Sequence, residues 1–405
     1  MMVVMSTTQP NAGVNRRQAP ASRPFAVPAL SLTGVLVVGQ LYSVLPLLAP
    51  VARDWGADQS TVAWTVTAFA IAYATGFLVS GPAADRFGPR RVIIAGGLAT
   101  AALTGAVALA PGAAAGLALR ALQGFAAASF APAAFSYIAT RVEAERRVTA
   151  ITWLTSSFLA AAVIGQLAAQ ALEQSIGWQG VFAASAAALA VAALGLRFVL
   201  APDQSPQPSG GGAVSGMLGL LRDRRLLLLY GATATVLLGF VGVYSGLQLS
   251  GPAWLTGDAQ ALLTLRASAL PAMLAVPLLS SRLARYSPGT RVPAALIGAA
   301  VTAAVTGLVA DLGPVALGVS LLAFAGCVAV AAPALIQAIG MRAGAARGSA
   351  TALYTFALFV GAGLGPQLAT VLSELGFTAV ALGTAAVLAV GGALALAALL
   401  RRAGD

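Results

Sequence analysis

A cluster of charged side chains lies in "GPAADRFGPRR", residues 81–91, between two long apolar segments. Its charged residues and the glycines beside them are Gly81, Asp85, Arg86, Gly88, Arg90 and Arg91. A carboxylate can pair with an arginine of its own loop or dock against the end of a helix elsewhere in the chain, and glycine permits close approach and tight turns. The stretch therefore predicts a latch, a contact that forms and breaks as the protein changes shape. The alternative is a solvated loop whose charges stabilise nothing in particular.

A second candidate is Arg120, about eight residues or 12 Å of helix inside an apolar segment. A charge at the bilayer centre costs about 2.5–3.5 kcal/mol, so Arg120 should face a cavity or a polar partner. Gln40 on another apolar segment and Gln123 one turn away are candidate neighbours, and Asp54 lies just outside. The alternative is that Arg120 extends to the nearer membrane surface.

Arg266 lies near the start of another apolar segment, where Asp258 is a candidate partner, and its role is either substrate binding and gating or an interfacial position. Gln166, Gln337 and Tyr354 add neutral polarity within apolar segments and are further candidates for substrate or gating contacts. Isolated residues of this kind also serve as packing contacts between helices.

Residue types that support catalysis are scarce. The sequence has no His and one Cys, Cys327, and none of its twelve acids lies at the centre of an apolar segment. It shows no nucleophile–base pair, metal-ligand cluster or phosphate-binding loop. We therefore expect no catalytic residue, no metal and no cofactor. If protons are moved, Asp54 and Asp85 are the nearest candidate carriers, with titration of the substrate as a further possibility.

Composition identifies the elements that must position these residues. The chain of 405 residues is 59% hydrophobic and 9% charged, with a mean hydropathy of +0.88, which is typical of a membrane protein. Apolar runs long enough to cross a bilayer as helices recur along it. The predicted spans are residues 27–49, 61–81, 92–110, 113–138, 148–172, 179–199, 225–248, 260–280, 292–310, 314–338, 348–372 and 377–399.

The basic residues, all arginine, predict the orientation. Twenty fall in one set of alternate loops and termini, Arg53 alone falls in the other set, and Arg120 and Arg266 lie within spans, which accounts for all 23. Positively charged loops stay in the cytoplasm, so both termini are expected there, in a multi-pass protein of the bacterial cytoplasmic (inner) membrane. This bias explains the net charge of +11 without nucleic acid as a partner.

The chain divides into two similar halves. "APDQSPQPSGGGAVSG" at 201–216 reads as a linker, and "ADRFGP" at 84–89 is echoed by "LARYSP" at 283–288. We expect two pseudo-symmetric six-helix bundles with a substrate cavity between them. The predicted parts are a disordered cytoplasmic tail at 1–26, an N-terminal bundle at 27–199, a cytoplasmic linker at 200–224 and a C-terminal bundle at 225–400.

With these motifs the sequence resembles the major facilitator superfamily. The 81–91 stretch is similar to the family's loop between spans two and three, and Arg120, Gln123 and Gly124 match its R-x-x-Q-G signature on span four. The resemblance implies a twelve-helix transporter in which the latch favours the outward-open form and Arg120 is associated with proton relay or with bonding to the backbone of span one. Ala284 stands opposite Asp85 in the second half, so the latch should be one-sided.

The chain looks most similar to the drug/proton antiporter branch, although it departs from that branch on span five. A glycine-proline pair is expected there, and this chain has Gly165 and Gln166; Gly365 and Pro366 keep the pair on span eleven. The resemblance implies proton-coupled efflux of a small amphipathic compound or drug by a monomer. The alternatives are uptake or exchange of a small organic anion bound by Arg120 and Arg266, and a membrane sensor or enzyme that transports nothing.

Overall fold

The computed structural model describes residues 24–203, 213–255 and 259–399, and within these ranges the regular elements are all helical. Most of the predicted tail, residues 204–212 of the predicted linker and Asp258 lie outside the described residues.

The first half of the chain contains one helix that is far too long for a single crossing. Its helices are α1 (Ala26–Tyr42), α2 (Leu48–Trp55), α3 (Gln59–Phe87), α4 (Pro89–Ala108), α5 (Ala113–Ala127), α6 (Phe130–Arg141) and α7 (Ala144–Val199). The 56 residues of α7 correspond to about 84 Å of helix against a hydrocarbon layer of about 30 Å. At Gly177 the backbone has φ +67° and ψ 171°, a non-helical conformation that glycine adopts readily. This residue breaks α7 into two crossings.

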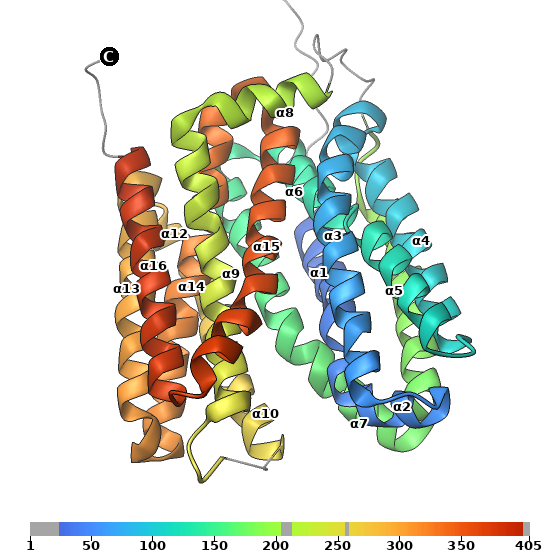
Figure 1. Cartoon of the computed structure of the whole chain (residues 1–405). Coiled ribbons are helices and arrows are strands. Elements are labelled where there is room, and N and C mark those ends of the chain that lie inside the picture. The colour runs from blue at the N-terminus through green and yellow to red at the C-terminus, as the bar shows by residue number, and fades with distance from the viewer. Residues whose placement is uncertain (1–23, 204–212, 256–258, 400–405) are drawn as a thin grey trace, which may run out of the picture.

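The second half begins with a short helix inside the predicted linker. Its helices are α8 (Ala213–Arg222), α9 (Arg224–Ser250), α10 (Ala259–Ala267), α11 (Leu270–Leu278), α12 (Ser280–Leu283), α13 (Pro288–Val309), α14 (Pro314–Ala343), α15 (Arg347–Ser373) and α16 (Phe377–Leu399). Figure 1 shows α8 lying across one end of the molecule. We call this the linker end, and the opposite end, where α2 and α10 lie, the far end.

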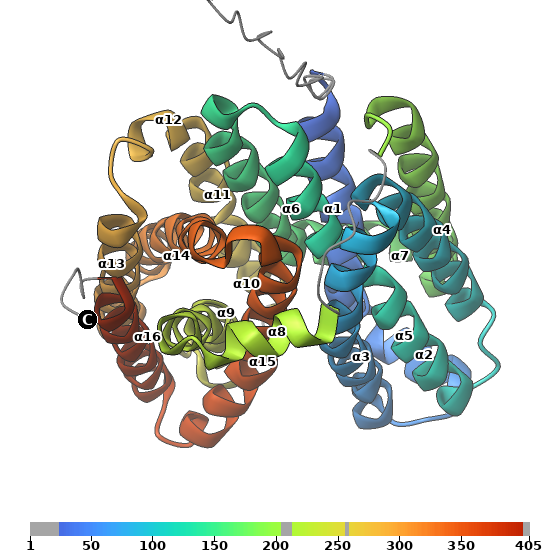
Figure 2. The same ribbon diagram turned by 90° about the horizontal axis from the view of Figure 1, so that it is seen from above.

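The predicted all-α membrane fold is confirmed. Eleven described helical stretches are long and apolar enough to span a bilayer, and because α7 crosses twice they provide the twelve expected crossings. Seen along the crossings, α1 and α3 to α7 gather on one side and α9, α10 and α13 to α16 on the other (Figure 2). The view also shows α8 extending from the second group toward the first.

The two halves repeat the same close helix crossings. In the first half, α1 packs on α7 where a Cβ at Gly165 would come 2.8 Å from the Gly39 carbonyl oxygen. In the second half, α9 packs on α15 where a Cβ at Gly365 would come 2.9 Å from the Gly242 amide nitrogen. Only glycine permits these approaches, so two small residues set each crossing.

A pair of equivalent hydrogen bonds shows the same repeat at the far end. Trp55 Nε1 donates to the Ala110 carbonyl oxygen at 3.2 Å, and Trp254 Nε1 donates to the Ala310 carbonyl oxygen at 3.2 Å. Donors and acceptors are each separated by about half the chain, as expected for a duplicated bundle.

The halves meet along two seams. Helix α3 packs along α15, and α7 packs along α11. In the first seam the Phe359 ring lies 4.7 Å from that of Tyr73 and 5.3 Å from that of Phe77. Aromatic packing of this kind gives the α3–α15 seam an apolar core between the halves.

Candidate functional site

A small cavity lies between the two halves. Four phenylalanines and two tyrosines dominate its lining, and the lining contains no charged residue. Its residues are Val38, Tyr42, Phe135, Thr155, Phe158, Leu159, Ala162, Leu237, Phe240, Ala332, Tyr354, Leu358 and Phe359. About 20 Å³ is open to the centre of a water-sized sphere, which is room for about one water molecule. The cavity is therefore closed in this conformation and must widen to admit an organic molecule.

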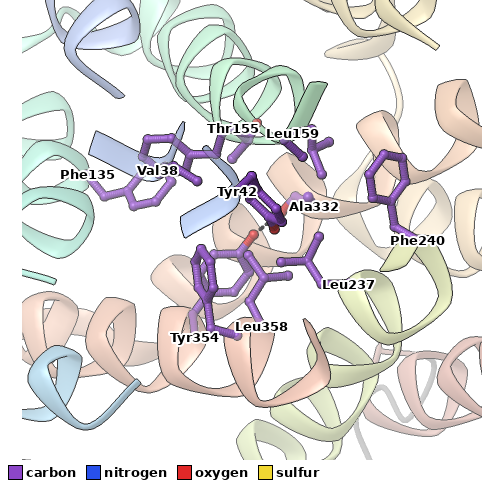
Figure 3. A pocket seen from close by; sticks show the side chains of 13 residues that line it. Val38, Tyr42, Phe135, Thr155, Leu159, Leu237, Phe240, Ala332, Tyr354 and Leu358 are labelled. Carbon is purple, nitrogen blue, oxygen red and sulfur yellow. Dashed lines mark hydrogen bonds between the residues drawn. The ribbon is translucent and has the colours of Figure 1, made fainter. Parts of the chain in front are cut away.

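Tyr354 is the predicted site residue that this cavity contains. Its hydroxyl donates to the Ala332 carbonyl oxygen at 3.0 Å, and its ring packs against Phe135 with the ring centres 6.2 Å apart (Figure 3). Since Phe135 belongs to α6 and Tyr354 to α15, this contact joins the two halves at the cavity. In Figure 3 the side chain of Tyr42, from α1, points toward the Tyr354 hydroxyl.

Asp85 lies at the linker end, on the seam between α3 and α15. Its carboxylate sits directly over Gly348, where an added Cβ would collide with both carboxylate oxygens. Because α15 begins at Arg347, the carboxylate faces the positive end of a helix from the other half. One turn back, a Cβ at Gly81 would come 2.6 Å from the Ala352 Cβ, so this seam also closes on glycine.

The arginines of the loop contact their own half. Arg90 Nη2 donates to the Arg197 carbonyl oxygen at 2.6 Å, and the Arg86 guanidinium lies 5.3 Å from the centre of the Phe87 ring. Within the described ranges, Asp85 forms no ion pair with these arginines. The cross-half contact of this stretch is therefore the carboxylate against α15.

Asp203 holds the same loop from the other side. Its two carboxylate oxygens accept the backbone N–H groups of Arg90 and Arg91, each at 3.0 Å, at the start of α4. Gly88 has φ +92°, and a Cβ there would collide with the Asp203 carboxyl group. Gly88 thus serves both the turn and the approach of Asp203, an acid that the sequence analysis did not single out.

A second contact between the halves, and an ion pair within the second half, also lie at the linker end. Ser280 Oγ donates to Thr149 Oγ1 at 2.9 Å, which joins α12 to α7 across the halves. Arg342 Nε lies 2.7 Å from Asp223 Oδ2, which joins the α8–α9 turn to the end of α14. Burial raises the pKa of Asp223, but the hydrogen bonds and the positive charge of Arg342 hold that pKa below its ordinary value.

Arg120 lies inside the first half and does not line the central cavity. Its side chain is fully buried, and Nη1 donates to Gln123 Oε1 at 2.7 Å. Gln123 Nε2 donates in turn to Thr104 Oγ1 at 2.6 Å and to Gln40 Oε1 at 3.3 Å. The structure thus brings Arg120 and Gln123 on α5, Gln40 on α1 and Thr104 on α4 into one polar network.

Aromatic rings and a glycine complete the surroundings of Arg120. Its guanidinium lies 4.5 Å from the centre of the Phe69 ring and 6.0 Å from that of Phe182, so ring faces partly replace the missing counter-ion. Gly124 leaves room for the α3 backbone, because a Cβ there would collide with the Phe69 carbonyl oxygen. Arg120 Nε and Nη2 have no hydrogen-bond partner in the described part of the chain.

Asp54 lies near this network but binds other residues. Its Oδ2 accepts Trp178 Nε1 at 2.7 Å and Gln179 Nε2 at 2.9 Å, where the chain turns beside Gly177. Asp54 therefore joins α2 to the break in α7 at the far end.

Arg266 bridges the two halves toward the far end. Its Nη1 donates to Gln166 Oε1 on α7 at 2.7 Å, and its Nη2 donates to Gln248 Oε1 on α9 at 3.0 Å. A charge-assisted hydrogen bond thus joins α7 of the first half to α10 of the second. Gln166 occupies the position where the drug-antiporter signature has proline.

The remaining predicted residues lie elsewhere in the second half. Gln337 accepts a hydrogen bond from Arg291 Nη2 at 2.7 Å. Gly365 forms the α9–α15 crossing, and Pro366 lies inside α15, where it leaves the carbonyl group one turn earlier without its helical N–H partner.

Sequence reasoning missed most of the cavity lining. Phe135, Phe158, Phe240 and Phe359 belong to four different spans, and a phenylalanine in an apolar span faces lipid, a neighbouring helix or a cavity with the same local sequence. The signal that separates these cases is the rotation of each helix, which the packing of glycines such as Gly165 and Gly365 sets.

Residues 30–366 match the family model of the Major Facilitator Superfamily. The chain belongs to this family. It is therefore a membrane transporter rather than an enzyme.

Curated relatives of this transporter align with part of its length. It is 30% identical over 184 residues to the multidrug resistance protein B homolog of Mycobacterium tuberculosis, covering 45% of this chain and 33% of that protein. It is 33% identical over 174 residues to the puromycin resistance protein pur8 of Streptomyces alboniger, covering 41% of this chain and 34% of that protein. The aligned region spans about a third of the length of these relatives.

A solved structure shows the fold over nearly the whole transporter. The major facilitator superfamily transporter FucP, in the outward conformation, superposes with a TM-score of 0.71 at 15% identity, covering 93% of this chain and 98% of that one. At this identity the likeness supports the fold alone.

Proposed function

We propose that this transporter exports small amphipathic compounds from the bacterial cytoplasm by alternating access, driven by the proton gradient. The observation that carries the proposal is the aromatic, uncharged cavity built by both halves, with contacts between the halves toward each end. An apolar aromatic lining with a few hydroxyl groups suits the body of an amphipathic molecule. The relatives named for multidrug and puromycin resistance support the same substrate class.

Alternating access follows from where the halves touch. The proposed moving bodies are residues 27–199 and 225–400, joined by 200–224 and working as a monomer. Opening the linker end must separate Asp85 from α15 and Ser280 from Thr149, whereas opening the far end must release Arg266 from Gln166. Contacts at the two ends therefore bias the protein toward opposite openings, as the proposed latch requires.

The orientation and the coupling ion belong to the same proposal. The linker end carries the arginine-rich loops, so we place it and both termini on the cytoplasmic side. No acid lines the central cavity, so the proton carriers we propose are Asp54 near the far end and Asp85 at the linker end. Asp85 lies at a contact between the halves that must separate at the linker end, whereas Asp54 binds Trp178 and Gln179 within the first half.

The uncharged lining favours export of amphipathic compounds over uptake of a compact organic anion. A small anion has little apolar surface to bury, and Arg120 lies outside the lining. An amphipathic compound gains more binding free energy than such an anion, because it buries apolar surface against the four phenylalanine side chains.

The test is uptake of amphipathic fluorescent dyes by everted membrane vesicles under an imposed proton gradient. We expect accumulation that a protonophore abolishes, and loss of accumulation in Ala162→Trp, which fills the cavity. Ala184→Trp, on an exposed face of α7, is the matched control and should transport normally. Accumulation by right-side-out vesicles in place of everted ones would reverse the proposed direction.

A further inference from the structure

A polar cluster forms the far-end roof of the central cavity. The roof cluster consists of Arg266, Gln166, Gln248 and Tyr244. Ala162 and Phe240 line the cavity, and Gln166 and Tyr244 follow them by one helical turn, or about 6 Å, on the same helices. The Phe240 and Tyr244 rings also pack together with their centres 5.0 Å apart. A molecule in the widened cavity would therefore have the roof cluster at one end.

The two hydrogen bonds of Arg266 resemble those by which an arginine binds a carboxylate. Two terminal nitrogens of one guanidinium each bind one amide oxygen, at 2.7 Å to Gln166 and 3.0 Å to Gln248. Two oxygens set before the planar fork of a guanidinium are the arrangement by which arginine recognises a carboxylate. Arg266 has no carboxylate partner within the described ranges.

Tyr244 supplies a second, independent sign of a ligand. Its side chain is buried, with 7% exposed, and its hydroxyl has no hydrogen-bond partner in the part of the chain described. The hydroxyl lies close enough to Arg266 for an electrostatic interaction. A buried hydroxyl beside a cation, at the edge of a cavity, is a donor without its acceptor.

We propose that the roof cluster recognises the acidic group of the exported compound, which makes the substrates amphipathic monocarboxylates. The apolar body lies in the aromatic cavity, and the carboxylate replaces the oxygens of Gln166 and Gln248 on Arg266 and accepts a further hydrogen bond from Tyr244. This inference rests on the proposed function and narrows its substrate class.

The replacement has a consequence for transport. Gln166 belongs to the first half and Arg266 to the second, so a carboxylate that displaces Gln166 removes a bond between the halves. Binding the substrate thereby loosens the far end, the end at which export must release it. A proline at position 166, as in the drug-antiporter signature, has no side-chain oxygen for this bond.

The experiment uses dansylglycine and its methyl ester, two amphipathic fluorophores that differ in one negative charge. Both are titrated into the purified full chain in detergent, and fluorescence gives the two dissociation constants. We expect the acid to bind about tenfold or more tightly than the ester, because a hydrogen-bonded charge contributes more than a neutral acceptor.

Variants assign that preference to the roof cluster. Arg266→Gln should weaken acid binding about 10- to 100-fold more than it changes ester binding, and Tyr244→Phe should weaken acid binding by about 5-fold relative to the ester. Arg266→Lys should keep part of the preference because it retains the charge but loses the fork. Arg282→Gln, at an exposed position on α12, is the control. Ester binding that persists shows that each variant is folded.

Equal binding of acid and ester by the wild-type protein, or equal loss of both in Arg266→Gln, overturns the inference. Vesicle transport separates that failure from failure of the proposed function. If the ester is exported and the acid binds no more tightly than the ester, the proposed export is supported and the carboxylate site is refuted. If the acid requires Arg266 for binding but neither compound is exported, the carboxylate site is supported and the proposed export is refuted.

Discussion

Replacing Gly81 by alanine should open the linker end. A Cβ at this position would come 2.6 Å from the Ala352 Cβ and 2.8 Å from the Gly348 carbonyl oxygen, where ordinary contacts begin at 3.4 Å. One of these neighbours is backbone, so relief requires α3 and α15 to separate by somewhat less than an ångström. Overpacking of this size costs about 1–3 kcal/mol, and the cost falls only on the closed seam. The population should therefore shift about 5- to 150-fold toward the form open at the linker end.

The shift is measurable as a distance between the halves. Spin labels at Arg146→Cys on α7 and Met341→Cys on α14, both exposed at the linker end, report the separation in a Cys327→Ala background. Gly81→Ala should move the distance distribution toward longer values. Gly105→Ala is the control, because its Cβ would meet only the Ala186 Cβ, at an ordinary 3.6 Å. An unchanged distribution in a folded Gly81→Ala protein refutes the view that this seam closes on glycine.

Three further substitutions test the polar contacts. Asp203→Ala removes the cap on α4 and should lower the free energy of unfolding by about 1 kcal/mol, with faster hydrogen exchange in the first turn of α4; equal exchange in both proteins would contradict this. Arg120→Ala should lower the melting temperature and the transport rate more than Arg266→Ala, because Arg120 is fully buried and its loss leaves Gln123 Oε1 without its donor; the reverse order would contradict this ranking. Asp223→Asn should destabilise the protein by about 0.5–1 kcal/mol at pH 7, since both side chains of its pair with Arg342 are about a third exposed. The lowered pKa of Asp223 means that this stabilisation is present above its unfolded-state value of about 3.9 and is lost as the pH falls through the folded-state value. Melting curves of wild type and Asp223→Asn should therefore differ at pH 7 and converge near pH 2, and a constant difference would exclude the ion pair as its source.

The lengths of the crossings were predictable because the bilayer sets them locally. A span needs about 20 apolar residues wherever it lies in the chain, so composition along a window finds it. The break in α7 follows the same rule, since 56 helical residues exceed one crossing and Gly177 offers the turn. The small helix α8 escaped prediction because it follows a stretch rich in Gly, Ser and Pro and, with 10 residues, is too short to cross a bilayer.

The polar contacts were predictable only in part. Gln123 follows Arg120 by three residues, a spacing that brings side chains together on any helix. The bond from Arg266 to Gln166 spans 100 residues, and the one from Asp203 to Arg90 spans 113. Local spacing carries no information about which helices become neighbours, so these partners came from the structure alone.

The sequence by itself determined that this chain crosses a membrane twelve times, and it indicated the family through two short motifs, because hydropathy and loop chemistry act over a few residues at a time. The tertiary structure alone decided that Asp85 faces α15, that Arg120 lies away from the cavity and that phenylalanines line it. Those outcomes depend on how far each helix is rotated about its axis. Glycine contacts between distant spans, such as Gly39 with Gly165, set that rotation.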